Sequence, residues 1–314
     1  MSDLNTTAIV LTLAASLVAA VPIGLAGLGE LLAERSGVLN LGVEGMMLLG
    51  AVTAFLVGDK TGSAMLALAV GSLAGAALAA VHAFLSITLR ASQIVSGLSL
   101  TIFGTGVATF IGKSIEGQPL KPSLPVIGWG PLADIPVLGP VLFDQDIMIY
   151  GVALLSVLIW FYLHRTRTGL ALRAVGESPA TADSMGINVT VMRYFHTVIG
   201  GVLAGAAGAY LILQVVPSWS QAGTTSGLGW IALALVVFAS WDPVRVLLGA
   251  FLFGFSRQLN FYFQGKGVDI PAEFLAMLPY VLAIVVLVLW GSRDLRRNAG
   301  APAALGLPYV RDER

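Results

Sequence analysis

The feature that most constrains this chain is a series of long stretches that contain no Asp, Glu, Lys or Arg. They cover residues 4–29, 61–89, 91–112, 147–164, 194–241 and 274–292. The hydrocarbon core of a bilayer is about 30 Å thick, and a helix needs roughly 20 apolar residues to cross it. Each of these stretches is therefore a candidate membrane span.

Three further spans follow from the same pattern. The stretch 36–58 is interrupted only by Glu44, and residues 194–241 are long enough for two spans and a loop. Residues 243–261 form another candidate. The sequence thus predicts an all-α polytopic membrane protein with about nine transmembrane helices, one of which is broken near residues 37–57.

The composition agrees with a membrane protein. Hydrophobic residues make up 57% of the chain and charged residues 11%, against roughly 25% charged residues in soluble domains. The 17 basic and 17 acidic residues balance, so we expect no binding to nucleic acid, which requires a cationic surface. Cys is absent, and the three His are far apart in the sequence. These features exclude a soluble enzyme or a disordered chain, and we expect no metal site.

The basic residues indicate how the chain crosses the membrane. Four Arg lie in residues 165–193 and five in residues 293–314. Cytoplasmic loops carry an excess of Lys and Arg, so both segments are expected inside and residues 113–146 outside. The C-terminus is then cytoplasmic and the N-terminus external. The chain divides into a transmembrane domain, residues 1–292, and a cytoplasmic tail, residues 293–314.

Two features of the pattern concern packing. The external loop 113–146 contains six Pro, which exclude a continuous helix, and we expect an ordered cap with a short helix or strand. Small residues recur at four-residue spacing, as in Gly71 and Gly75 and in Gly201 and Gly205. Such residues let helices approach closely in lipid. They predict either a seam between subunits or, more simply, packing within one chain.

Glu44 is the acid that lies well inside a candidate span. A charge at the centre of a bilayer costs at least about 2.5–3.5 kcal/mol. The surrounding residues 36–50 contain four Gly and the polar Asn40, which favours an interrupted helix facing an internal pathway. The alternative is that Glu44 lies near the interface and pairs with Arg35. His82 is interpreted as a neutral, hydrogen-bonded side chain of the bundle.

A second set of polar residues lies in the stretch 91–112. Gln93, Ser96 and Ser99 are in this candidate span, and Ser96, Ser99 and Phe103 share one face at helical spacing. A polar stripe with an aromatic ring could line a route for a flat, polar solute. Hydrogen bonding between helices explains the same pattern equally well.

The basic segment 165–193 contains a predicted short helix. Ser178 is a good cap, Pro179 suits the first helical position, and Gly186 suits a left-handed stop. A helix of about seven residues is not stable alone in water, so it must pack on something. It either docks a partner or rests on its own bundle. The sequence contains no Gly-x-x-x-x-Gly-Lys-Ser/Thr loop, so we do not expect the chain to hydrolyse ATP.

Three motifs resemble a known family. Residues 36–51, Ser-Gly-Val-Leu-Asn-Leu-Gly-Val-Glu-Gly-Met-Met-Leu-Leu-Gly-Ala, are similar to the second-span motif of ABC-importer permeases of the branched-chain amino acid, ribose and nucleoside superfamily. Residues 168–177, Thr-Gly-Leu-Ala-Leu-Arg-Ala-Val-Gly-Glu, resemble its cytoplasmic coupling loop, and residues 227–235 resemble a later motif on the pore side. The form Leu-Asn-Leu-Gly-Val-Glu-Gly is similar to the nucleoside branch.

The resemblance implies a type II importer permease fold with inverted repeats. It also implies two sets of functional residues. The first set would line the substrate pathway: Asn40, Glu44, Gln93, Ser96, Ser99, Phe103 and Trp230. The second set would couple the chain to an ATPase: Gly169, Arg173, Gly176, Glu177, Ala182 and Gly186.

The resemblance further implies partners and a location. The permease would pair with a second, related permease chain in a bacterial plasma membrane. Two cytosolic ATPase subunits, or one tandem ATPase, would use ATP and Mg²⁺, and an external binding protein would deliver substrate. This chain itself would bind no cofactor. Purine nucleosides are the first expectation for the substrate.

Other functions fit the residues as well. One alternative is a ribose-like sugar permease of the same kind. Another is an ion-coupled secondary transporter that uses Glu44 and needs no ATPase. A membrane-embedded enzyme is disfavoured because the sequence has no clustered His, Asp or Glu.

Overall fold

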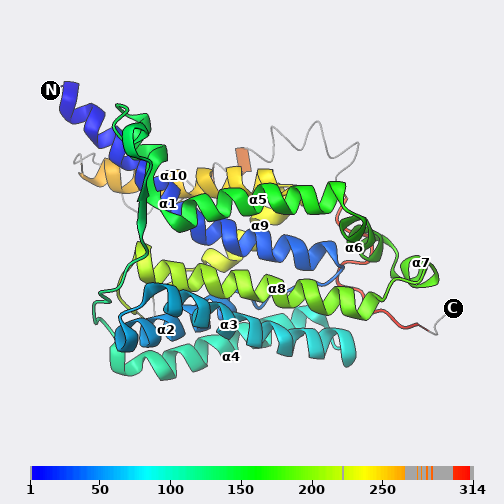
Figure 1. Cartoon of the computed structure of the whole chain (residues 1–314). Coiled ribbons are helices and arrows are strands. Elements are labelled where there is room, and N and C mark those ends of the chain that lie inside the picture. Colours follow the sequence, from blue (N-terminus) through cyan, green and yellow to red (C-terminus); the bar gives the residue numbers. More distant parts are fainter. Residues whose placement is uncertain are drawn as a thin grey trace.

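The computed structural model describes residues 2–220, 223–265 and 300–311, together with five separate positions between 274 and 285. The long helices run side by side along one common direction (Figure 1). Ten helices have these bounds: α1 Ser2–Arg35, α2 Val43–Thr61, α3 Ala64–Ala83, α4 Gln93–Gly112, α5 Ile147–Arg165, α6 Arg167–Glu177, α7 Pro179–Ser184, α8 Val189–Tyr210, α9 Leu228–Phe238 and α10 Pro243–Gly265.

Shorter elements complete the described residues. Wider π-type turns extend α3 over Phe84–Thr88 and α8 over Leu211–Val215. Residues 113–146 hold the strands β1 (Val126–Gly128) and β2 (Asp144–Asp146), which pair antiparallel. Three short helical segments lie in the same region: Lys113–Ile115, Gly130–Leu132 and Gly139–Phe143. The expectation that this region is ordered and not a continuous helix is confirmed, and it holds more short elements than the one helix or strand expected.

The two ends of the bundle carry different segments. The N-terminus and the residues between α4 and α5 lie at one end, whereas α6, α7 and the C-terminal segment lie at the other (Figure 1). The backbone N–H of Ala304 donates to the carbonyl of Gly176 in α6 over 2.9 Å, which joins the C-terminal segment to this end. The arrangement agrees with the predicted separation of residues 113–146 from the two basic segments.

Five described helical segments are long and apolar enough to cross a membrane: Thr7–Arg35, Ala64–Thr88, Gln93–Ile115, Ile147–Arg165 and Val189–Val215. A further helix, α9, is apolar but shorter. The stretch 194–241 is expected to hold two spans; it holds most of α8 and the shorter helix α9, so the second span stays a prediction. The predicted span 274–292 lies almost entirely outside the described residues. The structure is therefore that of a polytopic helical membrane protein, and the count of nine spans stays a prediction.

The span predicted to be broken near residues 37–57 is continuous from Val43 onward, and its non-helical residues 36–42 are the connection between α1 and α2. Helix α1 continues to Arg35, residues 36–42 form no regular helix, and α2 begins at Val43. The first span is thus longer than the expected 4–29, and the helix includes Glu30 and Glu34, which are 1% exposed. The view of Glu44 as the one acid well inside a span is wrong. A span defined by the absence of charged residues stops at the first acid. The helix itself can continue past a buried acid that accepts hydrogen bonds.

Small residues bring α3 and α8 together within one chain. A Cβ atom at Gly75 would clash with the Gly201 carbonyl oxygen. A Cβ atom at Gly205 would lie 2.5 Å from the Gly71 carbonyl oxygen. Both approaches are closer than any van der Waals contact, so only glycine fits. Close approach of this kind replaces the hydrophobic drive that lipid removes. The interpretation as packing within one chain is confirmed for these motifs.

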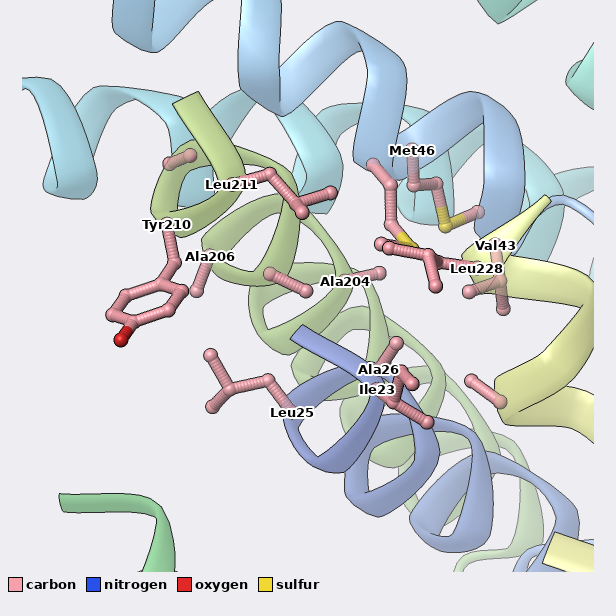
Figure 2. Close-up of a cluster of buried hydrophobic side chains, with 14 of the residues drawn as sticks. Ile23, Leu25, Ala26, Val43, Met46, Ala204, Ala206, Tyr210, Leu211 and Leu228 are labelled. Atoms are coloured by element: carbon pink, nitrogen blue, oxygen red, sulfur yellow. The ribbon is translucent and has the colours of Figure 1, made fainter. Parts of the chain in front are cut away.

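The apolar core lies where α1, α2, α8 and α9 meet. Figure 2 shows part of it, with Leu25 from α1, Met46 from α2, Tyr210 from α8 and Leu228 from α9. All four side chains are at most 5% exposed. This core surrounds α2, whereas the residues before α2 begin beside α6, which contacts the Arg35 carbonyl at the end of α1.

The basic segment contains one more helix than expected. Helix α6 begins after Thr166, whose hydroxyl accepts the N–H of Gly169 over 3.0 Å. Its buried residues Gly169, Leu172 and Gly176 recur at three- and four-residue spacing. Helix α6 was not among the elements expected from the sequence, although its amphipathic pattern is present there.

Candidate functional site

The unwound segment (residues 36–42) is held by side chains from neighbouring helices. The N–H of Leu39 donates to Gln93 Oε1 over 2.7 Å, and the Leu39 carbonyl lies 3.1 Å from His82 Nε2. The Leu41 carbonyl accepts from the hydroxyl of Thr101 over 2.8 Å. Irregular backbone at membrane depth requires such partners because no water is present there. Helices α3 and α4 therefore stabilise the break.

Asn40 lies at the centre of this segment and is 1% exposed. Its backbone N–H donates to Glu30 Oε1 over 2.9 Å, so α1 also holds the segment. Its side-chain Oδ1 accepts from the N–H of Gly42 over 3.0 Å, and its Nδ2 lies 3.4 Å from the sulfur of Met46. In this conformation the Asn40 side chain is committed to the backbone turn that leads into α2.

His82 is buried and has partners on both ring nitrogens, as interpreted. In addition to the Leu39 carbonyl, it contacts the hydroxyl of Ser96 over 3.1 Å. Ser96 is 5% exposed, whereas Phe103 is 59% exposed and Ser99 is also exposed. The three lie on one side of the continuous helix α4, as their spacing predicts, but only Ser96 belongs to its buried part. The buried stripe of α4 passes through Gly97, Leu100, Gly104 and Ala108. It therefore leaves Ser99 and Phe103 to one side.

Glu44 caps the beginning of α9. Its Oε1 accepts from the Thr225 hydroxyl over 2.5 Å and from the N–H of Gly227 over 3.0 Å, and its Oε2 accepts from the N–H of Gly229 over 2.7 Å. The residue before α9, Gly227, has a φ of +80° and provides no side-chain cap. A carboxylate at a helix N-terminus satisfies free N–H groups and complements the helix dipole. The side chain is 7% exposed.

The alternative pairing of Glu44 with Arg35 does not occur. Arg35 Nη2 donates to the carbonyl of Trp241 over 3.1 Å. The indole N–H of Trp241 in turn donates to the carboxylate of Glu34. This second cluster joins the end of α1 to the turn before α10. Sequence reasoning missed it because the two parts are about 200 residues apart.

The short helix of the basic segment forms as predicted. The hydroxyl of Ser178 accepts the N–H of Thr181 over 3.4 Å, and Pro179 begins α7. The helix ends at Ser184, and Gly186 has a φ of +83°. Ala182 is 3% exposed and anchors α7 against the protein, whereas Met185 is 78% exposed. One side of α7 thus rests on the protein and the other is exposed.

Helix α6 contacts the end of α1 directly. A Cβ atom at Gly176 would clash with the Arg35 carbonyl oxygen. A Cβ atom at Gly169 would clash with the Tyr162 carbonyl oxygen. Both glycines are therefore required by close backbone approach. Arg173 is half-buried between these contacts, and Glu177 is exposed at the end of the helix. The six predicted coupling residues lie together on α6, α7 and the turn after α7.

The seven predicted pathway residues do not form one cluster. Four are buried and used in hydrogen bonds within the chain: Asn40, Glu44, Gln93 and Ser96. Three are exposed: Ser99 and Phe103 on α4 and Trp230 on α9. Within the described residues, no group of three or more His, Cys, Asp or Glu could hold a metal ion.

The structure combines a helical membrane domain, a buried and hydrogen-bonded connection between α1 and α2, and paired short helices at one end of the bundle. The family model for permease components of branched-chain amino acid transport systems matches residues 12–287. The chain belongs to this family, as the resemblance of its motifs indicated.

Individual relatives cover nearly the whole chain. A protein of Haloferax volcanii assigned as a glucose ABC transporter permease is 43% identical over 95% of this chain and 97% of its own length. A guanosine ABC transporter permease protein of Bacillus subtilis is 37% identical over 96% of each chain. A nucleoside ABC transporter permease protein of Lactococcus lactis is 34% identical over the full length of both chains. No solved structure matches at a significant level.

Proposed function

We propose that this chain is the permease subunit of an ATP-driven importer and forms its translocation path with a second, related permease chain. The observation that carries the proposal is the pair of helices α6 and α7. They are anchored on the bundle by Gly169, Gly176 and Ala182, and they present the exposed Met185 at one end of the molecule. Two helices that are packed firmly on the bundle and exposed on their outer side are suited to bind a cytosolic ATPase.

The remaining partners follow from the two ends of the bundle. The end with α6 and α7 would face the cytoplasm, where two ATPase subunits or one tandem ATPase would consume ATP and Mg²⁺. The opposite end, with the N-terminus and residues 113–146, would face outside and receive a substrate-binding protein. This orientation and a plasma-membrane location rest on the concentration of Arg in the basic segments.

The proposed substrate is a neutral, hydroxyl-rich solute, with nucleosides first. The exposed aromatic rings of Phe103 and Trp230, on α4 and α9, could stack on a flat base, and the hydroxyl of Ser99 lies near Phe103 in the sequence. In the proposed arrangement these exposed residues line the path, and the buried Asn40 and Glu44 shape it. Two relatives are named for guanosine and nucleosides. A sugar is the second candidate because the relative that is 43% identical is assigned to glucose.

The test is uptake by membrane vesicles that contain this chain and the proteins that co-purify with it. We expect ATP-dependent uptake of radiolabelled guanosine that persists when an ionophore collapses ion gradients. Uptake of glucose instead would select the sugar alternative. Uptake that needs an ion gradient but no ATP would contradict the proposal and support the ion-coupled transporter.

The coupling residues have their own test. Reversing the charge of Arg173 or Glu177 should leave ATP hydrolysis by the complex but reduce uptake, because both side chains lie on α6 beside the proposed docking surface. Lys60→Glu is the matched control, since Lys60 is exposed at the far end of α2. Normal uptake in the α6 variants would remove these residues from the coupling site.

A further inference from the structure

The C-terminal strap (residues 302–311) is attached to both short helices of the basic segment. The N–H of Ala304 donates to the Gly176 carbonyl of α6 over 2.9 Å. Further along, Arg311 Nε lies 3.1 Å from Asp183 Oδ2 of α7. The strap therefore spans the outer ends of α6 and α7.

Apolar contacts reinforce this attachment. Tyr309 packs against a small cluster whose buried members come from α6, α7 and α8: Val175, Ala182 and Val189. This cluster is separate from the main core of the bundle. Because these side chains pack against one another, the strap, α7 and the start of α8 are expected to move as one body.

The middle of the strap is attached instead to the unwound segment. The N–H of Gly306 donates to the Gly37 carbonyl over 3.2 Å. Arg193 joins the same elements from α8, because its Nη1 donates to the Leu307 carbonyl over 3.1 Å and its Nε to the Ser36 carbonyl over 3.2 Å. A single guanidinium thus holds the strap and the start of the unwound segment together.

The side chain of Arg193 is closely surrounded by other atoms of the protein. The side chain is 2% exposed. Gly37 has a φ of +87°, and a Cβ atom there would lie 2.9 Å from Arg193 Nη2. By contrast, a hollow of about 560 Å³ lies beside the outer part of the strap, lined by residues such as Arg90, Asn188 and Arg311. The outer part has room to shift, whereas its inner attachment is tight.

We infer that the strap and Arg193 transmit displacement of α6 and α7 to the unwound segment. A shift of α7 moves Asp183 and the Tyr309 cluster, and the strap carries that shift to Gly37 and Ser36. Arg193 is a positioning residue because it acts through backbone groups and not on a solute. The inference rests on the proposed function, in which α6 and α7 receive the motion of an ATPase.

Ala304→Pro tests the strap. Proline has no N–H, so the variant loses the hydrogen bond to Gly176. Ala301→Pro is the matched control, because Ala301 is exposed and its amide makes no hydrogen bond to the described residues. Both variants are purified with the complete transporter and reconstituted. Uptake of guanosine and of glucose is measured together with ATP hydrolysis.

We expect uptake per ATP hydrolysed to fall about fivefold in Ala304→Pro, the factor that corresponds to one hydrogen bond, and to stay unchanged in Ala301→Pro. An unchanged ratio in Ala304→Pro would overturn the inference. A parallel fall of uptake and hydrolysis, at an unchanged ratio, would also overturn it, since that is the result of a merely structural contact.

Hydrogen exchange provides a readout that does not depend on transport. In the intact complex, Ala304→Pro and Arg193→Lys should both speed amide exchange in residues 36–42, and exchange in α4 should stay as in the wild type. Lysine lacks the planar fork that reaches two carbonyls at once. Unchanged exchange in residues 36–42 would contradict the strap. Absence of ATP-dependent uptake in the wild type would instead contradict the proposed function.

Discussion

Replacement of Glu44 by glutamine separates a capping role from a role in ion transfer. The carboxylate accepts three hydrogen bonds, from Thr225, Gly227 and Gly229. The glutamine side chain would keep one carbonyl oxygen and turn its amide group, which is a donor, toward at least one of these donors. The variant therefore keeps the size of the side chain and breaks part of the cap of α9.

The expected cost follows from these contacts. A hydrogen bond to a charged group contributes about 1.5–3 kcal/mol. A negative charge at a helix N-terminus contributes about 0.3–2 kcal/mol more, with the upper part of the range for partly buried sites. Since Glu44 is 7% exposed, the free energy of unfolding should fall by about 2–5 kcal/mol.

The assay is thermal unfolding of the purified transporter in detergent, together with uptake normalised to the amount of folded protein. We expect Glu44→Gln to unfold at a lower temperature and to retain reduced uptake. Asp59→Asn is the control, because Asp59 is exposed at the other end of α2. An unchanged unfolding temperature with complete loss of uptake would refute the capping argument and assign Glu44 to ion transfer.

Three further predictions concern packing and caps. Gly205→Ala should lower the free energy of unfolding by about 1–3 kcal/mol, because the added methyl group overpacks the contact between α3 and α8. Gly106→Ala is the control and should leave this free energy unchanged, since the space around Gly106 is open. Thermal unfolding of the two variants measures the difference. Trp241→Phe removes the donor to the buried Glu34 and should cost about 1–3 kcal/mol; a variant as stable as the wild type would contradict this contact. Gly186→Ala should strain its left-handed backbone by about 1–2 kcal/mol, which faster hydrogen exchange in α7 would reveal.

Much of the fold could be predicted because its determinants are local. A stretch without charged residues that is long enough to cross a bilayer predicts a membrane helix without any knowledge of its neighbours. The expected helices at 61–89, 91–112 and 147–164 are present. The short helix α7 follows from Ser178, Pro179 and Gly186, whose effects act within one or two turns. Helix α6 was not predicted, because its 11 residues include Arg167, Arg173 and Glu177 and therefore form no charge-free stretch.

The candidate site was only partly predictable. The motif at 36–51 indicated non-helical backbone with polar groups, which residues 36–42 show, but α2 itself is continuous and the motif did not identify the partners of these groups. Asn40 and Gln93 were expected in a pathway, and in this structure they hold the unwound backbone. The exposed faces of α4 and α9 depend on how these helices pack against their neighbours. The spacing of residues within a single helix does not determine that packing.

The sequence by itself determined that this chain is a polytopic helical membrane protein, where several of its long apolar helices lie and how α7 begins and ends. These properties depend on hydropathy over about twenty residues and on hydrogen bonds between residues three or four apart. Only the tertiary structure decided that Glu44 caps α9, that Glu34 meets Trp241 and that Arg193 ties the strap to residue 36. These contacts join residues more than 100 positions apart, and buried polar groups find such partners only when the packed helices bring them within hydrogen-bond distance.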